Sequence, residues 1–332
     1  MYTDEDLTSA VKAGIFTDAS VNAFRDHTAS LNDLPSVDEE NFQLVTSFND
    51  IFVVIACALV LTSIGWFGSS ISELMGAILF TVTTWGLAEF FVLKRRMALP
   101  AIVLLVSFLA GIFNISMAIL GPLSEVSLIS SGIITAIAAW LHWQRFQVPI
   151  TVAAGTAAAI GGVIAVTVAS TDASIKQWMT PLLFVSGFAT FLYAMWWDMA
   201  DRVRQTRKSD VAFWLHLIAA PLIVHPIFSI LGIFDGNNGL FEAGIVLVLY
   251  ALMAVLSIAI DRRAMLVSGL AYVLYACSML LKTYGIDSSS SAITGVIIGG
   301  ALLLLSVYWH SCRTVLFHFM PHAIQQYLPP LK

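Results

Sequence analysis

Ten long apolar runs, separated by short polar segments, constrain the fold of this chain more than any other feature. A helix needs about 20 predominantly apolar residues to cross the hydrocarbon core of a bilayer. The runs are continuous and lack the two-residue alternation of membrane β-strands, which predicts helices. The runs are Ile51–Phe67, Leu74–Leu93, Leu99–Leu120, Val126–Trp143, Val148–Ala169, Trp178–Met199, Val211–Ile233, Ala243–Ile260, Met265–Leu281 and Ile293–Trp309. We therefore predict an all-α polytopic membrane bundle of about ten transmembrane helices within residues 51–310, preceded by a short helical segment.

Charged residues are too scarce for a soluble protein. Of the 332 residues, 58% are hydrophobic and 11% are charged, and the mean hydropathy is +0.86. Soluble globular domains carry about 25% charged residues. So few charges would not cover a water-facing surface of this size, which excludes a soluble enzyme.

Basic residues gather on alternate connecting segments. With the N-terminus in the cytoplasm, all but two of the 16 Lys and Arg residues lie on the cytoplasmic side, as the positive-inside rule requires. The basic cytoplasmic loops contain Arg95, Arg96, Arg202, Arg204, Arg207, Arg262 and Arg263, together with Lys94, Arg145 and Lys208. The outer loops carry Glu73, Glu125, Asp172, Asp235, Glu242 and Asp287. This alternation predicts ten spans with both termini in the cytoplasm.

The two tails differ in composition. Residues 1–50 hold ten acidic and two basic residues; Thr3 and Gly14 predict the ends of one helix, and Thr17 predicts the start of a second. Two interpretations stay open: a solvated acidic tail, or a helical hairpin docked on the basic loops or on a partner. Residues 311–332 predict a short amphipathic helix that lies in the cytoplasmic interface.

Ionisable residues are rare within the apolar runs, and each is a functional candidate because its burial is costly. Glu89 would either pair with the nearby basic loop or bind a proton or cation. Asn114 lies deeper and would either join neighbouring helices or contact a solute. Asp198 lies at a predicted inner helix end, where contact with interfacial water accounts for it.

The seventh run contains two prolines, Pro221 and Pro226. Proline removes a backbone hydrogen bond, and broken helices line the binding sites of many transporters, although simple kinks also occur. If a solute or proton pathway exists, its candidate residues are Glu89, Asn114, His216 and His225.

Small residues mark two runs for close helix packing. The fifth run contains Gly155, Gly161 and Gly162, and the tenth contains Gly295 and Gly299. These are the last runs of two five-helix halves, which by parity would have inverted topologies. The layout resembles that of the ten-helix drug/metabolite transporters in architecture alone.

No motif of catalysis or of cofactor binding occurs in the sequence. The three cysteines are far apart and form no CxxC pair. His318 and His322 have the spacing of a metal pair, but the tail offers no carboxylate, so we interpret them as interfacial histidines. We predict no catalytic residue, no metal, no cofactor and no binding of nucleic acid.

The short N-terminal helix Asp4–Gly14, the Gly14–Asp18 turn, a second helix and then an unbroken membrane region resemble a broad group of multi-pass bacterial membrane proteins classified as domains of unknown function. The resemblance implies a location in the bacterial inner membrane. It transfers no catalytic residue.

Two functions remain after these exclusions. The first is a non-catalytic accessory or scaffold subunit that binds a membrane protein complex through its acidic tail, its helix faces or both. The second is a small-solute transporter with a pathway near the seventh helix. Coupled transport usually requires ionisable groups at mid-depth, which this sequence almost lacks, so we favour the scaffold.

Overall fold

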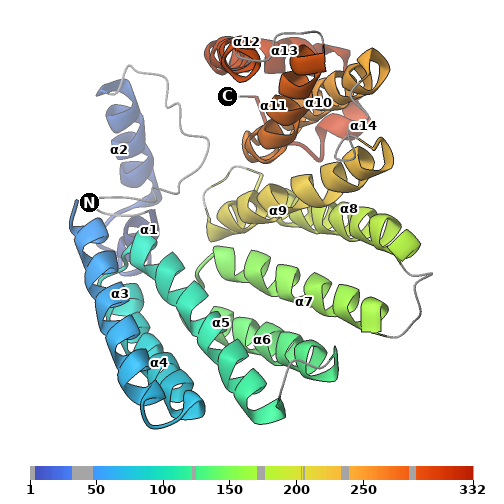
Figure 1. The fold of residues 1–332 in the computed structure, drawn as a ribbon. Helices are drawn as coiled ribbons and strands as arrows, with labels where there is room; N and C mark the ends of the chain where they lie inside the picture. Colours follow the sequence, from blue (N-terminus) through green and yellow to red (C-terminus); the bar gives the residue numbers. More distant parts are fainter. Residues whose placement is uncertain are drawn as a thin grey trace.

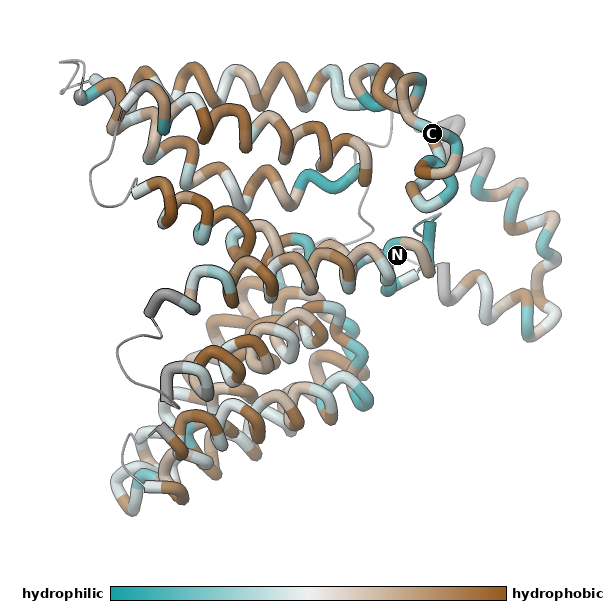
Figure 2. The backbone as a smooth tube through the Cα atoms, turned by 90° about the vertical axis from the view of Figure 1, so that its right-hand side faces the viewer, coloured by the Kyte–Doolittle hydropathy of each residue, from teal (hydrophilic) through white to brown (hydrophobic). Residues whose placement is uncertain are grey.

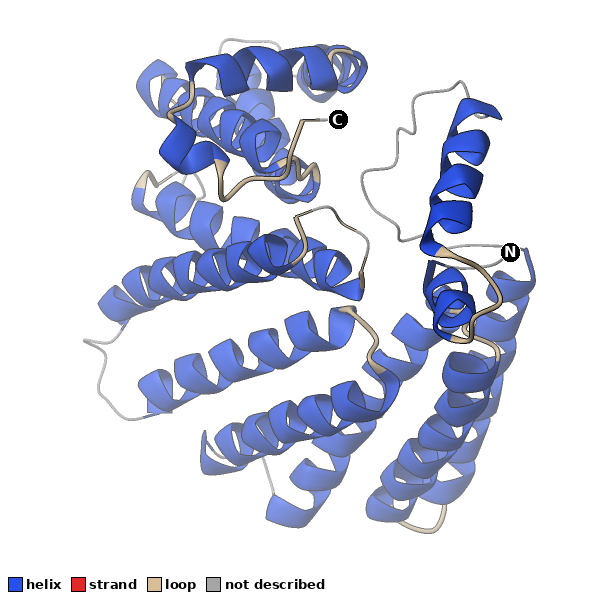
Figure 3. Ribbon diagram, turned by 180° about the vertical axis from the view of Figure 1, so that it is seen from behind, coloured by secondary structure: helices blue, strands red, loops and turns tan. Residues whose placement is uncertain are grey.

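The computed structural model describes residues 4–31, 48–121, 125–169, 176–202, 204, 206–232, 239–283 and 289–331. Every regular element in these ranges is a helix (Figure 3). This confirms the all-α class. The expected outer-loop acids Asp172, Asp235 and Asp287 lie outside the described residues.

Two short helices, α1 (Asp4–Lys12) and α2 (Asp18–Leu31), precede the apolar region. Gly14 between them has a φ of 72°, the left-handed conformation that favours glycine after a helix end. The backbone N–H of Ser20 donates to Thr17 Oγ1, and that of Thr17 donates to Ser20 Oγ, which caps the start of α2. The cytoplasmic position of this segment stays a prediction.

The first part of the apolar region consists of α3 (Phe48–Ser69), α4 (Glu73–Ala88), the π-helix η1 (Glu89–Lys94), α5 (Ala98–Leu120) and α6 (Glu125–Phe146). We call these elements the α3–α6 half.

Glycines allow the helices of this half to approach closely. A Cβ atom on Gly68 would lie 2.7 Å from the Cα of Gly76, and one on Gly111 would lie 2.2 Å from Oγ1 of Thr81. Real side chains do not tolerate such distances, so only glycine fits where α3 meets α4 and where α4 meets α5.

The rest of the chain continues through α7 (Ile150–Ala169), α8 (Lys176–Ala200), α9 (Arg207–Ile230), α10 (Leu240–Ile260), α11 (Ala264–Thr283), α12 (Ser290–Val307), α13 (Trp309–Phe319) and α14 (His322–Gln325). We call helices α8 to α13, with their connections, the α8–α13 half. Helix α9 lies at its centre, because it packs against α7, α8 and α11 and is the most buried of the candidate spans. Its helical assignment continues through Pro221 and Pro226.

Among the described residues, eight helices are long and apolar enough to cross a membrane. They are α3, α4 with η1, α5, α6, α8, α9, α10 and α11. The fifth expected span corresponds to α7, whose apolar part is shorter, Ile150–Ala165. The tenth corresponds to α12, which is followed after Tyr308 by a bend of 73° into α13; counted as one span, this pair would raise the number to nine. The structure thus has the features of a multi-pass membrane protein, and ten spans stay a prediction.

The helices form an open array (Figure 1). Most pack against their neighbours in sequence: α3 with α4, α4 with α5, α5 with α6, α6 with α7, and α8 with α9. Helix α9 departs from this order, since it joins α7 to α11. Apolar residues run along the helix shafts, and hydrophilic residues gather mainly near the helix ends (Figure 2). This distribution suits shafts in lipid and ends in water or at the interface.

Candidate functional site

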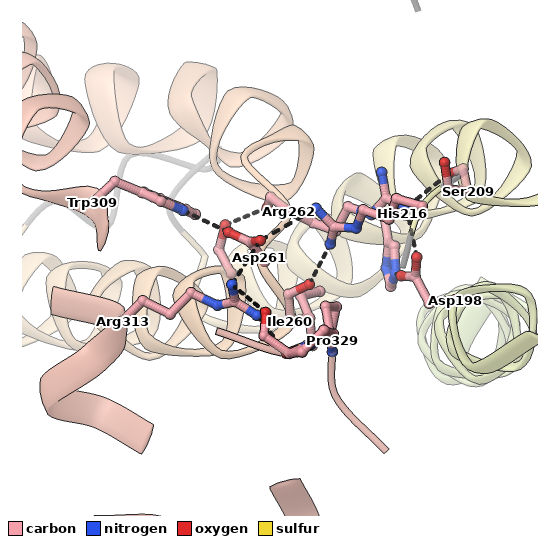
Figure 4. Close-up of polar contacts among 12 residues, drawn as sticks. Asp198, Ser209, His216, Ile260, Asp261, Arg262, Trp309, Arg313 and Pro329 are labelled. Atoms are coloured by element: carbon pink, nitrogen blue, oxygen red, sulfur yellow. Dashed lines mark hydrogen bonds and ion pairs between the residues drawn. The ribbon is translucent and has the colours of Figure 1, made fainter. Parts of the chain in front are cut away.

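Buried charges gather where the helices of the α8–α13 half end (Figure 4). The charged side chains come from the last turn of α8, the α8–α9 connection, the α10–α11 connection and α13. We call this set the buried charge network. It comprises Asp198, Arg204, His216, Asp261, Arg262, Trp309 and Arg313, each at most 5% exposed.

Asp198 is the centre of the first part of the network. Its Oδ1 accepts a hydrogen bond from Arg262 Nη2 at 2.6 Å, and its Oδ2 lies 2.9 Å from His216 Nε2. The same Arg262 nitrogen donates to the backbone carbonyl of Ser209 at 2.8 Å. One carboxylate therefore joins α8 to α9 and to the α10–α11 connection.

Asp261 is the centre of the second part. It follows α10 with a φ of 58°, a left-handed conformation that aspartate tolerates better than most residues. Its Oδ1 accepts from Trp309 Nε1 at 2.8 Å, and its Oδ2 lies 3.0 Å from Arg313 Nη1 and 3.4 Å from Arg204 Nη1. Arg204 also donates to the carbonyl of Ile260. Asp261 therefore joins the α10 end to α13 and to the α8–α9 connection.

The C-terminal residues close over the network. Arg202 donates to the carbonyl of Leu328 through Nε at 3.0 Å and through Nη2 at 2.8 Å. Arg313 Nη2 donates to the carbonyl of Pro329 at 2.7 Å. Leu328 and Pro329 are buried. The tail expected to lie in the interface thus folds back, in its last residues, onto the α8–α9 connection and α13.

Burying the charges of the network costs free energy, and its stability depends on the ion pairs and hydrogen bonds between them. Removing an ion from water costs several kcal/mol, which is offset only where each charge meets good partners. Each of the two carboxylates has partners from at least two other segments. Loss of one partner would leave a buried charge unbalanced, so the network holds five chain segments in a single arrangement.

The structure does not bring the four candidate pathway residues together. His216 belongs to the network, whereas His225 lies nine residues further along α9, about 13 Å away, with Nδ1 3.5 Å from the hydroxyl of Tyr272. Glu89 and Asn114 lie in the other half. Glu89 accepts two hydrogen bonds from Arg145 of α6, at 2.9 and 2.8 Å, in place of the expected basic loop of Lys94–Arg96.

Asn114 lines a cavity of about 740 Å³ between α3, α4 and α5. Its Nδ2 donates to the backbone carbonyl of Ala110 at 2.8 Å. It therefore neither joins two helices through this bond nor contacts another candidate residue.

Two of the predicted packing glycines lie near α6: Gly155 faces Ala139, and a Cβ on Gly132 would lie 3.9 Å from the Cα of Gly162. A Cβ on Gly155 would meet Ala139 at an ordinary 3.5 Å, and one on Gly161, Gly162, Gly295 or Gly299 would meet no atom within 4 Å. Packing of Gly161, Gly295 and Gly299 stays a prediction that needs a second molecule. The close approaches occur instead at Gly68, Gly76, Gly111 and Gly187. These glycines lie singly in their runs or form no repeat, so no spacing signal identified them.

The seven predicted loop arginines have four kinds of surroundings. Arg204 and Arg262 are buried in the network, and Arg202 holds the tail. Arg263 lies over the Trp309 ring at 5.0 Å and Arg95 lies over the exposed Phe90 ring at 5.6 Å. Arg96 and Arg207 are exposed.

Sequence reasoning missed three members of the network: Asp261, Arg313 and Trp309. It also assigned Asp198 to interfacial water, whereas the side chain is 3% exposed and paired. One signal was present, because Asp261 directly precedes Arg262 and Arg263 at the end of an apolar run. A carboxylate beside two arginines at such a point favours pairing across helices.

The network pairs aspartate with arginine and histidine side chains and so positions the segments that carry them. It contains no Ser, Cys or Lys nucleophile in its ion pairs. Across the described ranges, no group of three or more His, Cys, Asp and Glu side chains is placed to hold a metal ion. No family model, curated protein or solved structure matches this chain.

Proposed function

We propose that this chain is a non-catalytic scaffold subunit of a membrane protein complex in a bacterial inner membrane, with both termini in the cytoplasm. Its partners would be the lipid bilayer and other membrane subunits, without nucleic acid and without a cofactor. The observation that carries the proposal is that the two carboxylates of the buried charge network, Asp198 and Asp261, are held by other side chains of the network. Such pairs stabilise an arrangement of helices. Neither Asp198 nor Asp261 lines the cavity between α3, α4 and α5, the groove between α6 and α7, or the pocket at α13.

A coupled transporter would need the opposite arrangement. Its ionisable groups must exchange partners when the ion binds and leaves. Asp198 is held by α9 and the α10–α11 connection together, and Asp261 by three side chains. Exchange at either residue would break several contacts at once, which favours a rigid support.

The surface for a partner would include the glycine faces of α7 and α12. At Gly162 and Gly299 an added Cβ would enter open space. Gly162 and the exposed Trp140 of α6 both line an apolar groove of about 580 Å³ between α6 and α7. A helix of another subunit would bury these faces by close packing, as small residues allow in lipid.

The test is to purify the full chain from its native membrane in mild detergent and weigh the particles by native mass spectrometry. We expect a second subunit in fixed stoichiometry, and we expect Gly299→Leu to release it. Gly86→Leu is the matched control, because Gly86 of α4 is also exposed and meets no atom within 4 Å. A wild-type chain that is purified alone, or a partner that tolerates Gly299→Leu and Gly162→Leu, would contradict the scaffold.

The alternative function is a small-solute transporter, which the cavity at Asn114 favours. In that case solute uptake into vesicles would depend on the chain, and Glu89→Gln would abolish it if Glu89 couples transport to protons. Uptake unaffected by Glu89→Gln would remove this residue from the mechanism.

A further inference from the structure

The cavity between α3, α4 and α5 lies at the helix ends next to the α3–α4 turn. Its volume is about 740 Å³, within the range of small-molecule sites. Helix α5 diverges from α3 and α4 towards this end (Figure 1). The cavity is lined by Gly65, Ser69, Glu73, Gly76, Ala77, Phe80, Ala110, Gly111, Asn114, Met117, Ala118 and Gly121.

The fold explains why the space exists. Gly68 and Gly76 hold α3 and α4 in backbone contact, and Gly111 holds α5 against Thr81. Beyond Gly111 the side chains that face the diverging helices are mostly small, as at Ala77 and Ala118. Small side chains do not fill a widening gap, so a cavity remains.

The polar groups of the cavity are mainly acceptors. The hydroxyl of Ser69 donates its single hydrogen to the carbonyl of Gly65 at 2.8 Å, which leaves its lone pairs. The amide of Asn114 uses one N–H on the carbonyl of Ala110 and also has an acceptor oxygen. Glu73 adds a carboxylate at the first turn of α4, and no described residue forms an ion pair with it. A matching ligand therefore carries positive charge and N–H donors.

The wall has a gradient from polar to apolar. Glu73 and Ser69 lie beside the α3–α4 turn, where a charged headgroup meets water. Asn114 lies seven residues before Gly121, about 10 Å deeper along α5, and Phe80 and Met117 supply apolar surface. A ligand that fits this gradient has a polar end and a hydrocarbon body.

We propose that this cavity binds an amphiphile with a primary ammonium headgroup. The ammonium group would lie against Glu73 and Ser69 beside the α3–α4 turn, and the rest of the molecule would extend along Met117 and Phe80 to the level of Asn114. Membrane lipids with an ethanolamine headgroup and free alkylamines share this chemistry. The site is independent of the scaffold function, because its residues lie in the other half of the molecule from the buried charge network.

The test uses the purified full chain in nanodiscs of phosphatidylcholine, with dodecylamine as the probe. Binding is followed by the rise in thermal unfolding temperature and counted by native mass spectrometry. We expect one saturable site, and we expect Glu73→Gln to weaken it about tenfold through loss of a charged hydrogen bond. Glu242→Gln is the matched control: Glu242 also lies in the first turn of its helix, α10, but outside this cavity.

Two further arms identify the ligand class and its source. Dodecyltrimethylammonium keeps the charge but lacks N–H donors, so we expect it to bind at least about tenfold more weakly. In nanodiscs that contain phosphatidylethanolamine, the chain should retain this lipid and exclude dodecylamine if the lipid is the ligand. If dodecylamine still binds and the lipid is not retained, the ligand is the free amine.

Three outcomes would overturn the proposal: no saturable site for either amine, equal binding by dodecyltrimethylammonium, or unchanged affinity in Glu73→Gln. A fold defect is recognised from the unfolding temperature without ligand, and Asn114→Ala then provides a second variant that should weaken binding. If Asn114→Ala binds dodecylamine as the wild type does, the assignment of the site is wrong.

Discussion

The two halves of the apolar region are held together by different forces. In the α3–α6 half, glycines bring backbones together and an apolar cluster of rings forms the centre; Trp85 lies between Phe108 and Phe146, with ring centroids at 5.1 and 4.9 Å. In the α8–α13 half, ion pairs join the helix ends. Glycine contacts and ring packing leave a cavity where the helices of the α3–α6 half diverge. The directional ion pairs of the α8–α13 half specify one arrangement of helices. A support and a ligand site are therefore compatible within one chain.

The largest expected effect is the loss of Arg262. Arg262→Met leaves Asp198 buried without its strongest partner, which we expect to cost about 3–5 kcal/mol of unfolding free energy. Thermal unfolding in detergent, followed by tryptophan fluorescence, measures the effect. Arg95→Met is the control, because Arg95 is exposed. A double variant with Asp198→Asn should recover part of the loss, and equal stability of Arg262→Met and Arg95→Met would remove the difference between the halves.

The next effect belongs to the glycine contact of the α3–α6 half. In Gly76→Ala the new methyl group would lie 2.3 Å from Ser69 Oγ and 2.8 Å from the carbonyl of Gly65. We expect α3 and α4 to separate slightly, at a cost of about 1–3 kcal/mol. Gly86→Ala, on the same helix and in open space, serves as the control and should not be destabilised. If both variants unfold at the wild-type temperature, close backbone contact does not hold this half.

A smaller effect is expected for the indole of Trp309. Trp309→Phe removes the hydrogen bond to Asp261 but leaves Arg204 and Arg313 in place, so we expect a loss of about 1–2 kcal/mol. Trp196→Phe is the matched variant, since Trp196 is 56% exposed. Urea or thermal unfolding of the two proteins side by side gives the comparison; a larger loss for Trp196→Phe would contradict the assignment.

The smallest effect is expected for the ion pair between Glu89 and Arg145. Their side chains are 34% and 56% exposed, so solvent and salt screen the pair. Glu89→Gln should leave the unfolding temperature within the error of measurement at physiological salt. A loss as large as that of Arg262→Met would show that exposure is a poor guide to the strength of these pairs.

Local patterns in the sequence predicted the helices well and their contacts poorly. The long apolar runs predicted the membrane helices because period and composition are properties of one segment. The network combines Asp198, Asp261 and Arg313 from distant segments. An aspartate at a helix end can contact either interfacial water or an arginine of another helix, and the sequence around it does not distinguish the two. The bend at Tyr308 escaped prediction for a similar reason, since no proline or glycine marks it. Gly299 belongs to a run with the expected motif, yet an added Cβ there would meet no described atom within 4 Å.

Cysteine labelling of intact cells tests the central claim most directly: the chain crosses the membrane repeatedly and buries its charges where the α8–α13 helices end. Cys57, Cys277 and Cys312 are first replaced, and single cysteines are introduced by Ser70→Cys, Arg207→Cys and Ser209→Cys. Arg207 is exposed, whereas Ser209, two residues away and next to Arg262, is fully buried. We predict that an impermeant maleimide reaches position 70 from outside, position 207 only after the cells are opened, and position 209 only after denaturation. Labelling of position 207 from outside, or of position 209 as fast as position 207 in the native protein, would contradict the account.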